Sequence, residues 1–88
     1  MKNIDTIDMF LDKHLAHGSN LYSTGTHLIN YSTCIGQWDN GNLIINETKY
    51  NHTTSKNQNY LKRKSSNFVN KIIYVNDIPM NCKCLTKI

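Results

Sequence analysis

The sequence predicts an α+β domain: an N-terminal helix, an antiparallel meander of four to five short strands, and a second helix packed on one face of the sheet. Apolar residues at the N-terminus recur with the period of a helix. From Leu21 the apolar runs become short and β-branched, and from Ser55 the helical period returns. With 88 residues, of which 39% are hydrophobic, residues 1–88 suit a single domain with one modest core.

The first predicted element is an amphipathic helix over residues 4–17. Asn3 or Asp5 can cap its start, and Gly18 is placed to stop it. His14 lies beside the apolar face of this predicted helix. A histidine in such a place is more often packed or hydrogen-bonded in the core than a ligand. The apolar residues, which recur at spacings of three and four and so share one face, are Ile4, Ile7, Leu11 and Leu15.

Four short strands are predicted next, over residues 21–24, 27–31, 34–38 and 43–47. Asn40-Gly41 favours a hairpin between the last two, because both residues tolerate a positive φ. Gly36 within a strand indicates a bulge or a close approach of another group to the backbone. Trp38 is the largest apolar side chain in the chain. We expect it either to be buried or, if exposed, to anchor a partner.

The second helix is predicted over residues 56–66. Ser55 fits an N-cap and Gln58, three residues later, completes a capping box. Tyr60 and Leu61 are expected to face inward. Projection at 100° per residue places three residues outward, which are Asn59, Lys62 and Arg63. A further strand is expected over residues 71–76, and the last nine residues are expected to form a tail or a final edge strand.

The charge is distributed unevenly along the chain. The formal net charge is +4, but residues 1–48 hold two lysines against five acids and residues 49–88 hold eight lysines or arginines against Asp77 alone. This asymmetry favours contact between the basic half and an anionic partner, such as nucleic acid or an acidic protein surface. The simpler alternative is that the lysines only keep a small protein in solution.

Composition also argues against several classes of protein. Three cysteines, Cys34, Cys82 and Cys84, are an odd number for a disulfide framework, and Cys82-Lys83-Cys84 is too short for a zinc knuckle. We therefore expect reduced thiols, no metal and no cofactor. No apolar run is long enough to span a membrane. Acids stand near the N-terminus where a signal peptide would be apolar, so the expected location is the cytoplasm.

The segment over residues 49–64, KYNHTTSKNQNYLKRK, carries the candidate binding residues. A helix start presents unpaired N–H groups and a positive dipole end, so hydroxyls and a lysine there can hold a phosphate oxygen. Cations further along the helix can follow a nucleic-acid backbone beside an aromatic stacking face. The proposed contact residues are Tyr50, Thr54, Ser55, Lys56, Lys62 and Arg63. The structural alternative is a capped helix with a solvated basic face.

Residues for catalysis are few. Thr53 and His52 are a nucleophile and a base by type, but neighbours in an extended chain point to opposite faces. No paired carboxylates, P-loop or Ser-His-Asp set is present, so we do not expect an enzyme. The form of enzyme to test is a metal-independent ribonuclease built on His52, Lys56 and Tyr50.

Two segments carry a resemblance to a known family. Residues 27–36 contain the pattern Leu28-x-x-Tyr31-x-Thr33-x-Ile35, and residues 50–58 begin Tyr50-x-x-Thr-Thr-Ser-Lys. Over residues 20–65 the chain resembles a family of small proteins carried by phages, plasmids and other mobile elements of low-GC bacteria. It departs from that family at Asn51, where the family prefers Ser, and at Asn57, where it prefers His. If that His is a catalytic group in the family, this chain has lost it, which argues against an enzyme.

The resemblance implies a biological setting. Small proteins of mobile elements often bind and inhibit host machinery, CRISPR effectors among the targets. The first hypothesis is therefore an inhibitory binding protein of the anti-CRISPR type, acting in the host cytoplasm on a Cas effector, another host protein or ribonucleoprotein, or its RNA. The alternative is a small basic RNA- or DNA-binding accessory protein without an inhibitory role. A dimer is compatible with either hypothesis.

Overall fold

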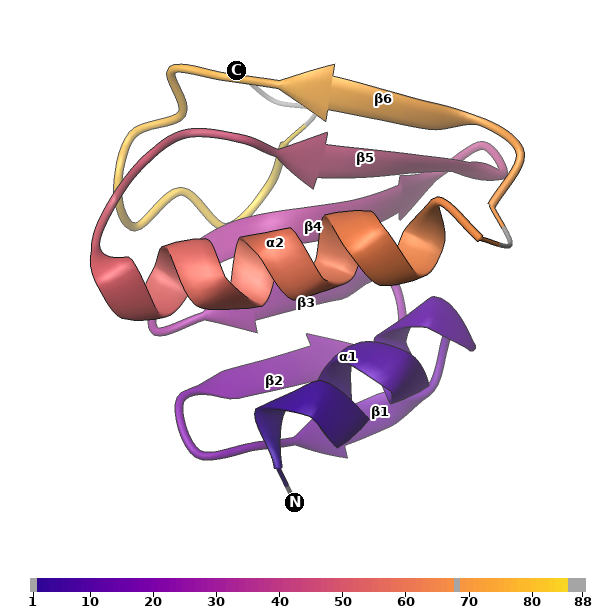
Figure 1. Ribbon diagram of the computed structural model, residues 1–88, viewed down its shortest axis with the longest axis horizontal. Coiled ribbons are helices and arrows are strands. Elements are labelled where there is room, and N and C mark those ends of the chain that lie inside the picture. Colours follow the sequence, from indigo (N-terminus) through magenta and orange to yellow (C-terminus); the bar gives the residue numbers. More distant parts are fainter. Residues whose placement is uncertain (1, 68, 86–88) are drawn as a thin grey trace.

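The computed structural model describes residues 2–67 and 69–85. Within them the chain forms two helices and one six-stranded sheet, which confirms the predicted α+β class but with more strands than the four to five expected (Figure 1). The elements are α1 (Asn3–Leu11), β1 (Leu15–His17), β2 (Leu21–Thr24), β3 (His27–Asn30), β4 (Thr33–Asp39), β5 (Asn42–Asn46), α2 (His52–Ser65) and β6 (Ile72–Val75).

The sheet is antiparallel from β1 to β5 and parallel at its last pair. The strands lie in the order of the sequence, and β5 pairs antiparallel with β4 through the hairpin at Asn40-Gly41. β6 then lies parallel to β5, because α2 carries the chain back across the sheet before β6 begins. The expected antiparallel meander therefore extends only to β5, and the strand predicted over residues 71–76 closes a β5–α2–β6 crossover.

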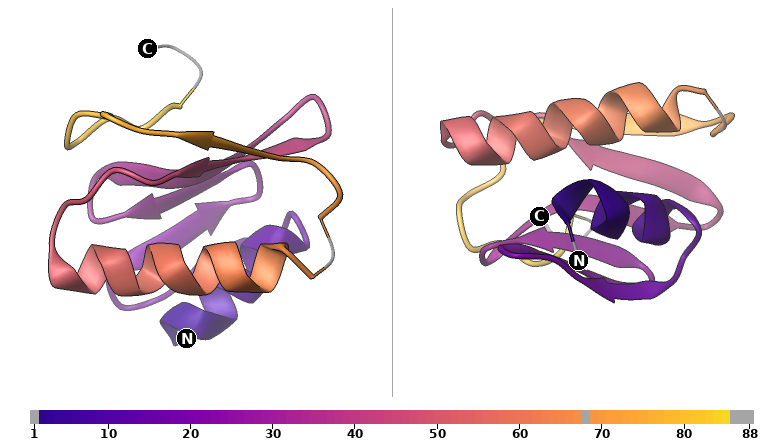
Figure 2. Two further views of the ribbon diagram at one scale, coloured as in Figure 1. Left: turned by 45° about the horizontal axis from the view of Figure 1, so that its top comes forward. Right: turned by 60° about the horizontal axis from the view of Figure 1, so that its bottom comes forward.

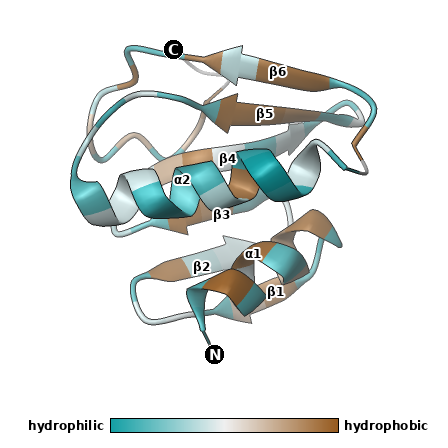
Figure 3. Cartoon of the chain, viewed as in Figure 1, coloured by the Kyte–Doolittle hydropathy of each residue, from teal (hydrophilic) through white to brown (hydrophobic). Residues whose placement is uncertain are grey.

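Both helices cover the same face of the sheet, and the C-terminal segment covers the other (Figures 1 and 2). On the helix face, residues of α1 and Leu61 of α2 pack against the strands, including Leu28 and Ile45. On the opposite face, Ile78 and Leu85 lie against three strand residues, which are Ile29, Cys34 and Ile44. The residues of α2 are mainly hydrophilic, whereas those of β5 and β6 are mainly hydrophobic (Figure 3). Each face of the sheet therefore has its own apolar cluster.

Gly36 allows α2 and α1 to approach the sheet closely. The register of β3 and β4 shifts between Leu28 and Ile29, so Ile35 is an extra residue in β4. A Cβ atom at Gly36 would lie 2.9 Å from the Cδ2 atom of Leu61 and 3.2 Å from the ring of Phe10. Both interpretations of Gly36 made from the sequence are confirmed, since a bulge and a close approach occur together.

The first helix is shorter than predicted. It ends at Leu11, and Lys13 follows with a φ of 62°. Residues 15–17 form β1 instead, paired with β2. Leu15, which fits the helical period, is 71% exposed, and His14 is exposed as well. The N-terminal helix is confirmed, but its predicted end at residue 17 is wrong, because residues 15–17 pair with β2 instead. The packed role of His14 is wrong as well.

The second helix begins earlier than predicted. Asn51 is its N-cap, with its side-chain oxygen accepting a hydrogen bond of 2.9 Å from the Thr54 amide. The capping box of Ser55 and Gln58 is therefore wrong. Leu61 is buried as expected, whereas Tyr60 is only half-buried. The helix turns a mainly polar face to the protein interior, formed by Thr54, Asn57, Gln58, Leu61 and Ser65.

Trp38 and the C-terminal segment are anchored by hydrogen bonds. The indole N–H of Trp38 donates to the Phe10 carbonyl at 3.0 Å, and the half-buried ring packs against Phe10. The amide of Cys34 donates to the Cys82 carbonyl at 2.8 Å, but residues 80–85 form no strand. The rest of the expected tail or edge strand, residues 86–88, lies outside the described residues. Among the described residues, no helix has the length and apolar character needed to cross a membrane.

Candidate anion-binding groove

The helix α2 divides the predicted contact residues between its two sides. Lys56 and Arg63 lie on the side that faces α1, where they line a common groove. Ser55 and Lys62 lie on the opposite side, beside Glu47. The six residues proposed from the sequence therefore do not form one surface, and only Lys56 and Arg63 belong to the groove between the helices.

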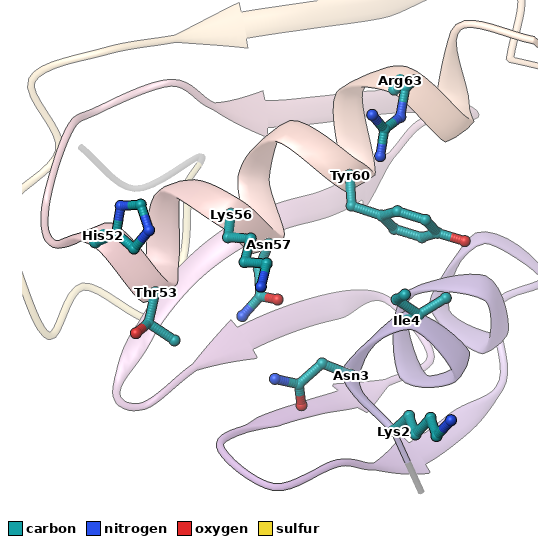
Figure 4. Close-up of a pocket in the computed structure, with 9 residues that line it drawn as sticks. All are labelled: Lys2, Asn3, Ile4, His52, Thr53, Lys56, Asn57, Tyr60 and Arg63. Carbon is teal, nitrogen blue, oxygen red and sulfur yellow. The ribbon is translucent and has the colours of Figure 1, made fainter.

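The groove runs between the start of α1 and the first three turns of α2 (Figure 4). Its volume is about 450 Å³. Asn57 and Tyr60 extend from α2 toward α1, and Ile4, which is 50% exposed, lies across from them. The cationic residues that line the groove are Lys2, Lys56 and Arg63, with His52 at the start of α2. No carboxylate lines it in the described part of the chain.

Two helix N-termini border this groove. Lys2 is the N-cap of α1 and makes no side-chain capping bond, while His52 and Thr53 are the first two residues of α2. The first amides of a helix lack partners within it, and the aligned peptide dipoles place positive charge there. Of the amides at the start of α2, that of Thr54 already donates a hydrogen bond to the Asn51 side chain. The start of α2 and the cationic side chains therefore contribute positive charge to the groove, while Asp5 in the first turn of α1 and Asp8 beside Tyr60 offset part of it.

Tyr60 is held against α1 at one end of the groove. Its hydroxyl donates to the Asp8 carboxylate at 3.2 Å, and the Arg63 guanidinium lies 5.8 Å from its ring centroid. Burial raises the pKa of Tyr60, and the negative charge of Asp8 raises it further. The hydroxyl therefore remains protonated at neutral pH, and the aromatic ring presents a fixed flat surface beside Arg63.

Asn57, which lines the groove, belongs to a buried amide pair. The Nδ2 atom of Asn57 donates to the Oδ1 atom of Asn30 over 2.6 Å, and both side chains are buried. This bond ties α2 to the end of β3. Within the described residues the Nδ2 atom of Asn30 has no hydrogen-bond partner. The Asn57 side chain is thus oriented by the protein rather than by solvent.

Lys62 has its own partner on the other side of α2. Its ammonium lies 2.9 Å from the Glu47 carboxylate and 5.7 Å from the ring centroid of Tyr74. Both members of the ion pair remain more than a third exposed, so the pair adds little stability. The local charge of Lys62 is nevertheless offset, which sets it apart from Lys56 and Arg63.

Tyr50 and Thr54 hold the fold together outside the groove. The Tyr50 hydroxyl donates to the Ile78 carbonyl at 2.6 Å and accepts a bond of 2.9 Å from Asn46. Thr54 is only 3% exposed. The expected stacking role of Tyr50 and the expected contact role of Thr54 therefore have no place in the groove.

The residues suggested for a ribonuclease are only partly brought together. His52 and Lys56 line the groove, whereas Tyr50 lines a separate hollow beside Asn51 and Met80. Among the described residues, no cluster of three or more His, Cys, Asp or Glu side chains is placed to hold a metal ion. The structure therefore brings together two of the three residues suggested for a ribonuclease.

The sequence did not indicate several residues of the groove. Lys2 belongs to the acidic half of the chain, and only the packing of α1 beside α2 brings it to Lys56. Asn57 stands out in the sequence only as a departure from the family that the chain resembles. No family model, curated protein or solved structure matches the chain. The case for a function therefore comes from the geometry and charge of this groove.

Proposed function

We propose that the protein is a non-enzymatic inhibitor that binds nucleic-acid phosphates on a host defence ribonucleoprotein, of the CRISPR-effector type, through the groove between α1 and α2. The observation that carries the proposal is the gathering of Lys2, Lys56 and Arg63 around one groove that no described carboxylate lines. The start of α2, whose first turn holds no acid, adds positive charge at one end of the groove.

A phosphodiester backbone suits this groove better than a single small anion. Lys56 and Arg63 are seven residues apart on one helix face, which is about 10 Å along the axis at 1.5 Å per residue. Cations at that spacing can contact separate phosphates of an extended strand. The exposed Ile4 side chain and the Tyr60 ring supply apolar surface between them for a sugar or a base.

The inhibitory setting is supported by the resemblance of residues 20–65 to proteins of phages and mobile elements. Within that setting, a cationic groove of this size would compete for the RNA or DNA that an effector exposes. The location implied is the cytoplasm of a host bacterium. The runner-up proposal is an RNA- or DNA-binding accessory protein, which uses the same groove and inhibits nothing.

Binding of fluorescently labelled single-stranded RNA, followed by anisotropy, tests the groove. The test variant is Lys56→Glu/Arg63→Glu. The matched control is Lys49→Glu/Lys83→Glu, which makes the same change in net charge at two exposed lysines outside the groove. We expect the groove variant to lose at least about tenfold in affinity and the control to lose much less. Equal losses in both variants would show that only net charge matters and would overturn the proposal.

Target cleavage by guide-loaded CRISPR effectors separates the two functions. The inhibitor proposal predicts that the protein blocks cleavage by at least one effector class, and that Lys56→Glu/Arg63→Glu restores it. A protein that binds RNA through the groove but leaves every tested effector active would be an accessory protein instead. Raising the salt from 50 to 200 mM should weaken free-RNA binding steeply in either case.

A further inference from the structure

The outer edge of β6 is open to pairing. The sheet ends at β6, and no strand among the described residues lies beyond it. Ile73 is 40% exposed and Tyr74 is 47% exposed, although both are large hydrophobic residues in a strand. An exposed strand edge presents unpaired N–H and C=O groups that can pair with another strand. This edge is distinct from the groove, which lies on the α1 side of α2.

The hydrogen bonds to β5 determine which residues of β6 point outward. The Lys71 carbonyl accepts from the Leu43 amide at 3.2 Å, and the Val75 carbonyl accepts from the Glu47 amide at 2.7 Å. Main-chain groups of alternate residues point to the same side of a strand. Because Lys71 and Val75 point toward β5, the amides and carbonyls of residues 72, 74 and 76 point away from it.

We propose that a second copy of this chain pairs with this edge, β6 against β6, antiparallel about a two-fold axis at Tyr74. The outward residues then form hydrogen-bonded pairs, Tyr74 with the second Tyr74 and Ile72 with the second Asn76. Between them, Ile73 faces the second Val75 across the strands. A two-fold axis makes the contact self-complementary, so every pair other than the central one occurs twice.

Charge favours this register over its neighbours. In it, Lys71, which comes just before β6, lies near the far end of the second copy's β6, where Asp77 follows the strand with a φ of 58°. Each end of the short pair therefore brings opposite charges close together. A shift that keeps the same outward residues but moves the axis to Ile73 places Lys71 opposite Val75 and leaves Asp77 unmatched. The strand β1, at the other edge of the sheet, has an exposed Leu15 but offers no such pair of opposite charges.

Side chains on both faces fit the same pairing. Tyr74 lies on the α2 side of the sheet, because the Lys62 ammonium sits 5.7 Å from its ring centroid. Two tyrosines would therefore meet between the two α2 helices, which lie on one face of the extended sheet. On the other face, Val75 already packs against the cluster of Ile44 and Ile78. Ile73 of the second copy would extend that cluster.

Sedimentation equilibrium with charge-swapped variants tests the register. The parent is expected to form dimers at micromolar to high-micromolar concentrations. Lys71→Glu and Asp77→Lys should each weaken dimerisation at least tenfold, since like charges then face each other, and the double swap should restore it. Circular dichroism and melting temperature check that each variant stays folded. A parent that remains monomeric at several hundred micromolar, or a Lys71→Glu variant that dimerises like the parent, would overturn the proposal.

Oxidative cross-linking gives a second readout. A directly opposed pair has its Cα atoms about 5.5 Å apart, within the range for a disulfide. Tyr74→Cys should therefore give a covalent dimer on a non-reducing gel. Ile73→Cys is the matched control in the same background, because two residues at position 73 are diagonal in this register and too far apart to bridge. Cross-linking that is equal at the two positions, or stronger at position 73, would contradict the register.

Discussion

The ammonium of Lys62 lies 2.9 Å from the carboxylate of Glu47, at the end of β5. This ion pair uses one of the cations of α2 on the side of the helix away from α1. Lys56 and Arg63 lie on the α1 side, in a groove that no described carboxylate lines. The basic surface of α2 is therefore two surfaces of different charge, and variants can distinguish them.

Arg63→Gln and Lys62→Gln are expected to differ in the salt dependence of RNA binding. Removing a cation that contacts phosphate lowers the slope of log affinity against log salt by roughly 0.7 for a single strand. We expect that change for Arg63→Gln and none for Lys62→Gln, whose charge is offset by Glu47. Titrations at four salt concentrations measure the slopes. A change for Lys62 that is as large as the one for Arg63 would contradict the division of the helix.

Asn51→Ala should destabilise the protein by about 1 kcal/mol, because the Thr54 amide loses its cap. Ser55→Ala is the matched control. Ser55 is within the helix, where the change is expected to cost less than about 0.5 kcal/mol. Urea unfolding of the two variants measures the difference. A larger loss of stability for Ser55→Ala would show that Ser55 caps the helix, as the capping box predicts.

Trp38→Ala should lower the free energy of unfolding by about 3 kcal/mol, since the ring packs on Phe10 and its N–H bonds to the Phe10 carbonyl. Trp38→Phe keeps most of the packing and removes the donor, so we expect about 1 kcal/mol. Thermal or urea unfolding measures both. If Trp38→Ala is as stable as the parent, the packing of the Trp38 ring does not contribute to the free energy of unfolding.

Stability should fall at alkaline pH through Cys34. Burial is the main cause that raises the pKa of this thiol to about 12 from 9.0. Because the folded pKa is the higher one, the contribution is complete below pH 9 and is lost as the unfolded thiol ionises between pH 9 and 12. The slope for one proton is about 1.4 kcal/mol per pH unit. Between pH 8 and pH 10.5, the free energy of unfolding should fall less for Cys34→Ala than for the parent. Equal losses would contradict the role of the Cys34 thiol.

The class of the fold could be predicted from the sequence because the spacing of hydrophobic residues distinguishes helices from strands. The predicted helix boundaries that are wrong lie where tertiary contacts override the spacing of the hydrophobic residues. Leu15 fits the stripe of α1, but β2 offers residues 15–17 a strand partner. At α2, five successive residues from Asn51 to Ser55 are mostly able to cap a helix. In the structure Asn51 is the cap, and the start at His52 makes Thr54 part of the buried face of the helix.

The groove was less accessible to sequence reasoning. Lys56 and Arg63 were identified by their charge, and their spacing of seven residues places them on one helix face. Lys2 lies 54 residues from Lys56 in the sequence, so nothing local connects them. The separation of Lys62 depends on where β5 ends, because that places Glu47 beside it. Charge could be predicted from the sequence, whereas its division into two surfaces required the packing of α1, α2 and β5.

The most direct test of the central claim is an NMR titration of ¹⁵N-labelled protein with a short single-stranded oligonucleotide such as hexauridylate. The groove predicts that the largest amide shifts occur at the start of α1 and along one side of α2, at residues Asn3, Thr53, Lys56 and Arg63. Ser55 and Lys62, on the other side of the helix, should shift little. Shifts centred on Ser55 and Lys62, or no saturable shifts at low salt, would contradict the account.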